Sequence, residues 1–201
     1  MTNEKILELL ENNQIEELKK QLMQEIIIKN SNNKNKQKAI LKLSQQAEKE
    51  QRDTYYKKSA DGTYKYIRPA IAGAWFDNGT TNICDGYYLY KSNEIINGLQ
   101  MIPKQNDLNL LDLNKIIPYN DFNEKNKIKL DVEELIKAVK QPQANKKETK
   151  TIRVENNLFN AELLFNLYNC FDEDVDVFMI TNAILFKDKD AIGMLLKLRE
   201  L

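Results

Sequence analysis

Apolar residues in the first 30 positions recur at helical spacing. Ile15, Leu18 and Leu22 follow one another at three- and four-residue steps, as they do on one face of an α-helix. The pair Asn12-Asn13 interrupts the pattern, and Asn13 is a suitable cap for the second of two helical segments. The pattern therefore predicts two short helices within residues 2–30, followed by a polar loop.

A further helix is predicted from about Lys36 to Tyr55. Ile40, Leu43 and Ala47 form its apolar stripe. Polar side chains follow another face of the same helix at three- and four-residue steps; they are Lys38, Lys42, Gln45, Lys49 and Arg52, and four of the five are basic. Residues 31–58 carry eight basic and three acidic side chains, so this segment is locally basic.

After residue 62 the pattern changes to that of β-strands. Thr63–Asp77 is rich in aromatic and β-branched residues, and Asp77-Asn78-Gly79 is typical of a hairpin turn. A second strand is predicted over Asn82–Tyr90. Residues 93–125, which contain two prolines, are predicted to be irregular.

The second half of the chain alternates between helical and strand patterns. Lys127–Lys140 is predicted to be a short strand that leads into a helix capped by Asp131. The remaining elements are a strand over Thr151–Glu155, an apolar helix over Leu158–Phe171, and strands over Val175–Thr181, Ile184–Lys187 and Gly193–Leu198. Consecutive strands joined by tight turns indicate an α+β fold with an antiparallel sheet.

The length and composition exclude several kinds of chemistry. A chain of 201 residues suits one domain with an appendage, or two very small domains. The 30 basic and 30 acidic residues cancel, which argues against a protein that coats nucleic acid through its overall charge. The chain contains no histidine, which removes Ser-His-Asp and Cys-His nucleophiles and histidine-ligated metals.

The two cysteines indicate a reducing environment. Cys84 and Cys170 are far apart in the sequence and form no CxxC pair, so we expect two buried thiols in the cytosol. No apolar run approaches the ~20 residues that span a membrane, and the first residues have no signal-peptide pattern. We therefore expect a soluble, cytoplasmic protein that makes no membrane contact.

No motif in the chain predicts catalysis, a metal or a cofactor. The densest acidic run (Asp172, Glu173, Asp174 and Asp176) lacks the glycine of a calcium loop and is expected to be a solvated turn. The glycines do not have the spacing of a phosphate-binding loop. We expect a protein that is not an enzyme and has no cofactor. The alternative is an enzyme that uses two carboxylates, but no spacing among the acidic residues singles out a pair.

Aromatic residues are concentrated between residues 63 and 90. They are Tyr64, Tyr66, Trp75, Phe76, Tyr87, Tyr88 and Tyr90. Such a set could serve as a stacking platform for single-stranded bases. Aromatic residues in strands more commonly pack a sheet against helices, so we predict that most of them belong to the core and the sheet surface.

Two stretches resemble the modules of bacterial sliding clamps, the beta subunit of DNA polymerase III. Arg68–Phe76 (RPAIAGAWF) is similar to the clamp strand RP-x-L-x-G-[VI]-x-[FL]. Cys84–Leu89 (CDGYYL) is similar to the clamp strand [AT]-T-D-G-[YH]-R-L, with Tyr88 where clamps usually carry a basic residue. Thr151–Arg199 resembles the second half of a clamp module, with a strand, a helix that starts near Phe159 and three antiparallel strands.

The resemblance implies a fold and a domain organisation. The expected fold is α+β, with N-terminal helices followed by one DNA-clamp-like module of antiparallel sheet with packed helices. The module would cover residues 34–201 after a helical appendage over residues 1–33, as in small clamp-like proteins of phages and integrated elements of Gram-positive bacteria. The helices near residues 36–55 and 158–170 would then pack on the same face of one sheet.

The resemblance also implies a function. Clamps join several modules into a ring and line its hole with basic helices that hold phosphate. Lys38, Lys42, Lys49 and Arg52 are therefore the candidate nucleic-acid-binding residues. The second helix carries no Lys or Arg, and its outward residues would be Asn160, Glu162, Asn166 and Asn169.

We therefore expect a non-catalytic binding protein of a phage or mobile element that contacts a replication or defence protein, with weak DNA binding at most. The alternative is a homo-oligomeric sliding clamp that encircles DNA, or a replication accessory factor.

Overall fold

The computed structural model describes residues 34–49, 56–58, 64–66, 73–77, 79–94, 96, 98–99, 111–143 and 148–199. The helices expected within residues 2–30, and the candidate residue Arg52, lie outside the described residues.

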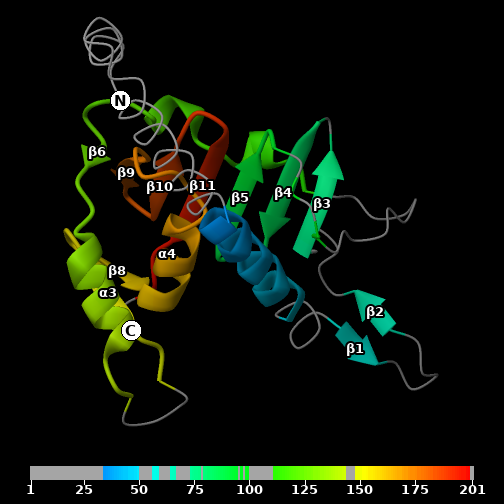
Figure 1. Ribbon diagram of the computed structural model, residues 1–201, viewed down its shortest axis with the longest axis horizontal. Helices are drawn as coiled ribbons and strands as arrows, with labels where there is room; N and C mark the ends of the chain where they lie inside the picture. Colours follow the sequence, from blue (N-terminus) through cyan, green and yellow to red (C-terminus); the bar gives the residue numbers. More distant parts are fainter. Residues whose placement is uncertain are drawn as a thin grey trace, which may run out of the picture.

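A seven-stranded antiparallel sheet is the main feature of the fold (Figure 1). Its strands in spatial order are β3 (Gly73–Asp77), β4 (Thr80–Cys84), β5 (Tyr88–Ser92), β11 (Ala191–Leu196), β10 (Ala183–Lys187), β9 (Asp176–Ile180) and β6 (Lys127–Ile128). Two hairpins form smaller sheets, which are β1 (Tyr56–Lys58) with β2 (Tyr64–Tyr66) and β7 (Thr151–Val154) with β8 (Asn157–Asn160).

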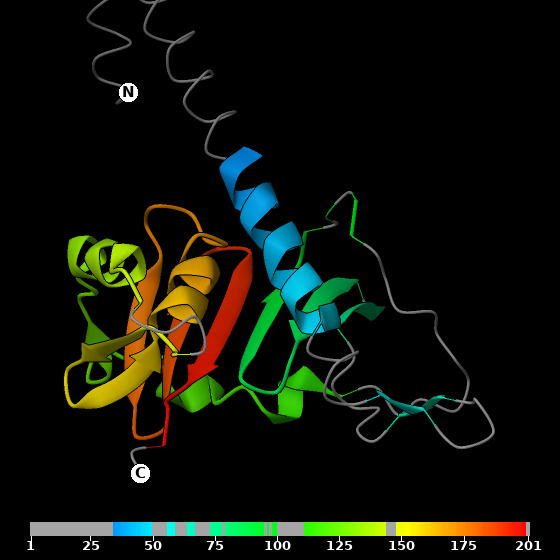
Figure 2. The same ribbon diagram turned by 90° about the horizontal axis from the view of Figure 1, so that it is seen from below.

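The helices and the irregular segment cover opposite faces of the large sheet (Figure 2). The helical residues 34–49, α3 (Val132–Lys140) and α4 (Ala161–Tyr168) lie on one face. The 3₁₀-helices η2 (Leu113–Lys115) and η3 (Tyr119–Asp121) lie on the other face. We call these the helix face and the η face. The sequence-based expectation of an α+β fold with an antiparallel sheet and packed helices is confirmed.

Each face of the sheet has its own apolar cluster. On the helix face, Ile40, Leu43 and Leu164 are buried in the same cluster as Tyr90 of β5. The strands alternate between the faces, so neighbouring residues of β3 and β5 contribute to the other side. On the η face, Trp75 and Leu89 pack with residues of the η2 segment. The helix over residues 34–49 and α4 therefore pack on one face of one sheet, as expected from the sequence.

Short-range sequence signals positioned several elements correctly. Gly79 has a φ of 78° in the β3–β4 turn, a left-handed conformation that glycine adopts without strain. The Asp131 carboxylate accepts a hydrogen bond from the Glu134 N–H at 2.9 Å and caps α3 as predicted.

Two of the predicted elements were wrong in their bounds. The strand expected over Asn82–Tyr90 is divided into β4 and β5, because the Asp85 carboxylate accepts hydrogen bonds from the N–H groups of Tyr87 and Tyr88 at 2.7 and 2.9 Å. The helix expected over Leu158–Phe171 begins only at Ala161. The residues before it form β8, because they pair with β7.

The end of α4 and the residues after it lie close to the sheet at Gly193 of β11. A Cβ at this position would lie 2.7 Å from Phe171 Cζ and 3.2 Å from Leu167 Cδ1, so the site has no room for a side chain. Phe171 is itself stacked on Phe186, with ring centroids 5.5 Å apart, which limits how far its ring can move. Gly193 therefore sets the distance between α4 and the sheet.

The substitution Gly193→Ala should lower the free energy of unfolding by about 1–3 kcal/mol, because it forces a methyl group into a packed core. Urea denaturation measures the loss. In a Phe171→Leu background the same substitution should cost less, because the clashing ring is gone. An equal cost in both backgrounds would show that Phe171 is not the source of the strain.

Candidate functional site

The helix over residues 34–49 packs beside α4 through both apolar and polar contacts (Figures 1 and 2). Tyr88 Oη donates a hydrogen bond to the backbone carbonyl of Leu43 at 2.7 Å and so joins the helix to β5. Lys42 Nζ donates to Asn166 Oδ1 at 3.0 Å, and Asn166 Nδ2 lies 3.5 Å from Gln46 Oε1. These contacts form a polar seam between the two helices above the apolar core.

The predicted nucleic-acid-binding residues within the described part of the chain share one side of their helix. At 3.6 residues per turn, Lys38, Lys42 and Lys49 lie within roughly 40° of one another around the helix axis. All three are exposed, although Lys42 also contacts α4. The structure therefore brings three of the four predicted residues together.

The face of α4 differs from the expectation in one respect. Asn166 was expected to point outward, but it is only 9% exposed because it faces the neighbouring helix. Glu162 does lie on the exposed side, and its Oε1 is 3.3 Å from Lys150 Nζ. Lys150 thus supplies positive charge beside α4, which has no basic residue of its own.

Lys36 forms a buried ion-pair cluster that sequence reasoning missed. Its side chain is only 7% exposed, and its Nζ lies 3.6 Å from Asp188 Oδ2, 3.3 Å from Asp172 Oδ2 and 3.9 Å from Glu94 Oε2. These carboxylates come from three separate loops, which follow β10, α4 and β5. One ammonium group therefore ties the start of the helix to three parts of the fold.

Asp188 is the most deeply buried partner of Lys36, with a side chain only 3% exposed. Its Oδ1 accepts hydrogen bonds from the N–H groups of Asp190 and Ala191, at 2.8 and 2.6 Å. One carboxylate thus fixes the β10–β11 turn and also holds Lys36. The buried Asp188 carboxylate therefore needs a positively charged partner, because an unpaired buried charge is strongly unfavourable.

The pKa of Lys36 depends on its burial and on its three acidic neighbours. Burial by itself lowers the pKa of the ammonium group, since it disfavours the charged form. The nearby charges of Asp188, Glu94 and Asp172 outweigh burial and raise the pKa above its ordinary value of 10.5. Lys36 is therefore held in its charged form at neutral pH.

The acidic run is partly solvated, as expected, and partly used in ion pairs. Glu173 and Asp174 are exposed. Asp172 contacts Lys36, and Asp176 Oδ1 lies 2.7 Å from Lys127 Nζ. Among the described residues, no group of three or more Cys, Asp or Glu side chains is arranged to hold a metal ion.

The aromatic side chains that the structure describes do not form one platform. Tyr88 and Tyr90 are buried on the helix face, whereas Trp75 is 3% exposed on the η face. These three residues belong to the core, as predicted, and the side chains of Tyr64 and Tyr66 lie outside the described part of the structure. Phe76 and Tyr87 are exposed, at 46% and 55%.

Both cysteines are buried, as predicted. Burial raises the pKa of the Cys84 thiol to about 11 and also raises the pKa of the Cys170 thiol. Neither thiol is ionised at neutral pH, which makes both poor nucleophiles.

Comparisons with protein-family models, with curated proteins and with solved structures found no match to this chain. In the parts of the chain that the structure describes, no helix has both the length and the apolar character needed to cross a membrane.

The substitution Lys36→Met should lower the free energy of unfolding by about 3–5 kcal/mol, because it leaves the buried Asp188 carboxylate without its ammonium partner. Chemical denaturation at pH 7 measures the effect. Lys38→Met, two residues away on the exposed side, is the matched control and should change stability by no more than about 0.5 kcal/mol. Equal losses of stability in Lys36→Met and Lys38→Met would show that the ion pairs of Lys36 make no specific contribution to stability.

The stability difference between the native chain and the Lys36→Met variant should also depend on pH. Because the folded-state pKa of Lys36 is raised, its contribution is fully present below the unfolded value of 10.5. The contribution is lost as the pH rises through the folded-state value. Denaturation curves of both proteins should therefore converge above pH 10.5, and a constant difference would contradict this account.

Proposed function

We propose that this chain is a non-catalytic binding protein that acts through contact with a protein of a replication or defence system. The observation that carries the proposal is a pair of large, exposed side chains at one end of the sheet. Tyr87 is 55% exposed and Leu196 is 38% exposed. They are neighbours, since the Leu196 N–H donates to the Tyr87 carbonyl at 2.8 Å. Tyrosine is among the residues enriched at protein interfaces and their energetic hot spots, and Leu196 adds apolar area beside it.

The second part of the proposal is that the fold is a clamp-like module of a phage or mobile element. Its support is the sequence resemblance together with the arrangement of the matching stretches. Cys84–Leu89 contributes to β4 and β5, and Thr151–Arg199 contains β7 to β11. These stretches meet where β5 pairs with β11, and two helices pack on the same face of the resulting sheet.

A homo-oligomeric DNA clamp is the second candidate function. The outward side shared by Lys38, Lys42 and Lys49 favours it, as does the pairing of Glu162 with Lys150. The absence of basic residues from α4 and the zero net charge of the chain weigh against it. We therefore place protein contact first.

Duplex DNA should bind no tighter than micromolar at physiological salt. Fluorescence anisotropy at several salt concentrations, on duplex and single-stranded oligonucleotides, measures this. If the basic side faced phosphate, log K would fall by roughly 0.9 per neutralised phosphate on duplex DNA. Replacing Lys38, Lys42, Lys49 and Arg52 by Gln would then reduce that slope by up to about 3–4. Nanomolar binding whose slope the four-Gln variant removes would favour the DNA clamp.

Tyr87→Ser combined with Leu196→Ser should abolish capture of a specific protein partner from a Gram-positive lysate, without changing the unfolding midpoint of the chain. Affinity capture followed by mass spectrometry identifies the partner. Ile116→Ser is the matched control, because Ile116 is 39% exposed and lies on the η2 segment. A partner lost equally with the control variant would refute the assignment of this patch.

A further inference from the structure

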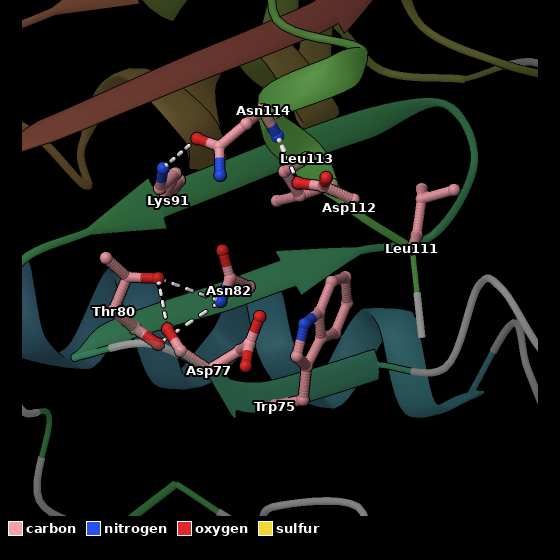
Figure 3. Close-up of a pocket in the computed structure, with 9 residues that line it drawn as sticks. All are labelled: Trp75, Asp77, Thr80, Asn82, Lys91, Leu111, Asp112, Leu113 and Asn114. Carbon is pink, nitrogen blue, oxygen red and sulfur yellow. Dashed lines mark hydrogen bonds between the residues drawn. The ribbon is translucent and has the colours of Figure 1, made fainter. Parts of the chain in front are cut away.

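A small polar pocket lies on the η face, between β3, β4, β5 and the η2 segment (Figure 3). Its volume is about 110 Å³. An apolar cavity of ~150 Å³ is large enough for benzene, so this pocket suits a group of one ring or less. Residues from β3 to β5 form its floor, and η2 forms its opposite wall.

The orientation of the Asn82 side chain is determined by its neighbours. Asn82 Nδ2 donates to the carbonyl oxygen and to the hydroxyl oxygen of Thr80, both at 3.2 Å. A carbonyl can only accept, so this edge of the amide must be the NH₂ group. Oδ1 therefore points into the pocket (Figure 3). Asn82 is only 4% exposed, and none of the described residues donates a hydrogen bond to its Oδ1.

The side chain of Asn114 is oriented in the same way from the opposite wall. Its Oδ1 accepts hydrogen bonds from Lys91 Nζ and from Tyr119 Oη, the latter at 2.9 Å. Lysine can only donate, so the Oδ1 assignment is determined and Nδ2 points into the pocket (Figure 3). The pocket thus offers an acceptor from Asn82 and a donor from Asn114.

The charged groups around the pocket are of both signs. The carboxylates of Asp77 and Asp112 and the ammonium of Lys91 all line it, so the lining has one more negative than positive group and disfavours an anion. Asn82 Oδ1 opens into the pocket, so an N–H group of a ligand can reach it and donate a hydrogen bond. A ligand that also carries a carbonyl or ring acceptor would satisfy Asn114.

We propose that this pocket binds a small, neutral, planar amide, through an N–H donor to Asn82 Oδ1 and an acceptor for Asn114 Nδ2. Pyrimidine bases and primary carboxamides both carry an N–H donor next to a hydrogen-bond acceptor. The proposal does not depend on the clamp-like function, because it involves none of the residues assigned to partner or DNA contact.

Trp75 makes the proposal directly measurable. It is the single tryptophan of the chain and lines the pocket, so its fluorescence and its one indole N–H signal in NMR report on this site. Acetamide, cytosine and uracil are the probes. Acetone, which has the carbonyl without the N–H, is the control ligand. We expect the three amide probes to shift the indole signal with saturable, millimolar binding, as their small size allows.

Asn114→Asp is the most informative variant. It keeps an oxygen for Lys91 and Tyr119 but replaces the donor that faces the pocket by an acceptor. Binding of the amide probes should weaken at least about tenfold. Asn120→Asp introduces the same charge on the adjacent helix η3, at a residue that does not line the pocket, and should bind as the native chain does. Equal unfolding midpoints for both variants would confirm that the pocket group alone has changed.

The relative affinities identify the source of the ligand. Tighter binding of cytosine or uracil than of acetamide would assign the pocket to a nucleobase, and the reverse order would assign it to a carboxamide. The proposal is overturned if no amide probe shifts the indole signal, which would indicate a pocket that holds only water. It is also overturned if acetone binds as well as acetamide, or if Asn114→Asp leaves binding unchanged.

Discussion

The pairing of β5 with β11 is the contact on which the rest of the structure depends. It joins two sets of strands that lie about a hundred residues apart in the sequence, with Tyr90 opposite Gly193 and Leu89 opposite Met194. Because side chains alternate between the faces of a sheet, this single register decides which residues meet the helices and which meet the η2 segment. A shift by one residue would move the residues of each apolar cluster to the opposite face. The polar seam between the helices and the pocket on the η face therefore both depend on this register.

Local signals in the sequence predicted most of the elements, because a turn or a cap depends on a few adjacent residues. The hairpin at Gly79 and the cap at Asp131 are examples. The start of α4 was misplaced, because a short apolar run such as Leu158–Asn160 fits a strand as well as a helix. Only its pairing with β7 decides between them. The register of β5 against β11 has no local signal at all, since it depends on contacts between distant segments.

The residues of the candidate site also divide into those that local sequence signals predict and those that only the complete fold brings together. The basic side formed by Lys38, Lys42 and Lys49 could be predicted from helical spacing alone. Lys36 could have been recognised too, because it falls four residues before Ile40 and seven before Leu43, on the apolar stripe of its own helix. A lysine on an apolar stripe requires a buried counter-charge. Its main partner, Asp188, is 152 residues away and is brought to it only by the complete sheet.

The charges around this helix bear directly on the choice between protein and DNA as a partner. Three carboxylates surround Lys36, and two of them, Asp172 and Glu94, remain about half exposed, at 54% and 48%. These carboxylates lie near the exposed Lys34 and Lys38, so the start of the helix carries both signs of charge, whereas Lys42 and Lys49 add positive charge further along. A DNA backbone that followed the helix would meet carboxylates among the lysines at its start. Its affinity depends on the number of phosphates that are neutralised, so such a mixed surface gains little. A protein surface carries both signs of charge and can match this pattern at each point, so the charges of this helix are compatible with the proposed protein contact.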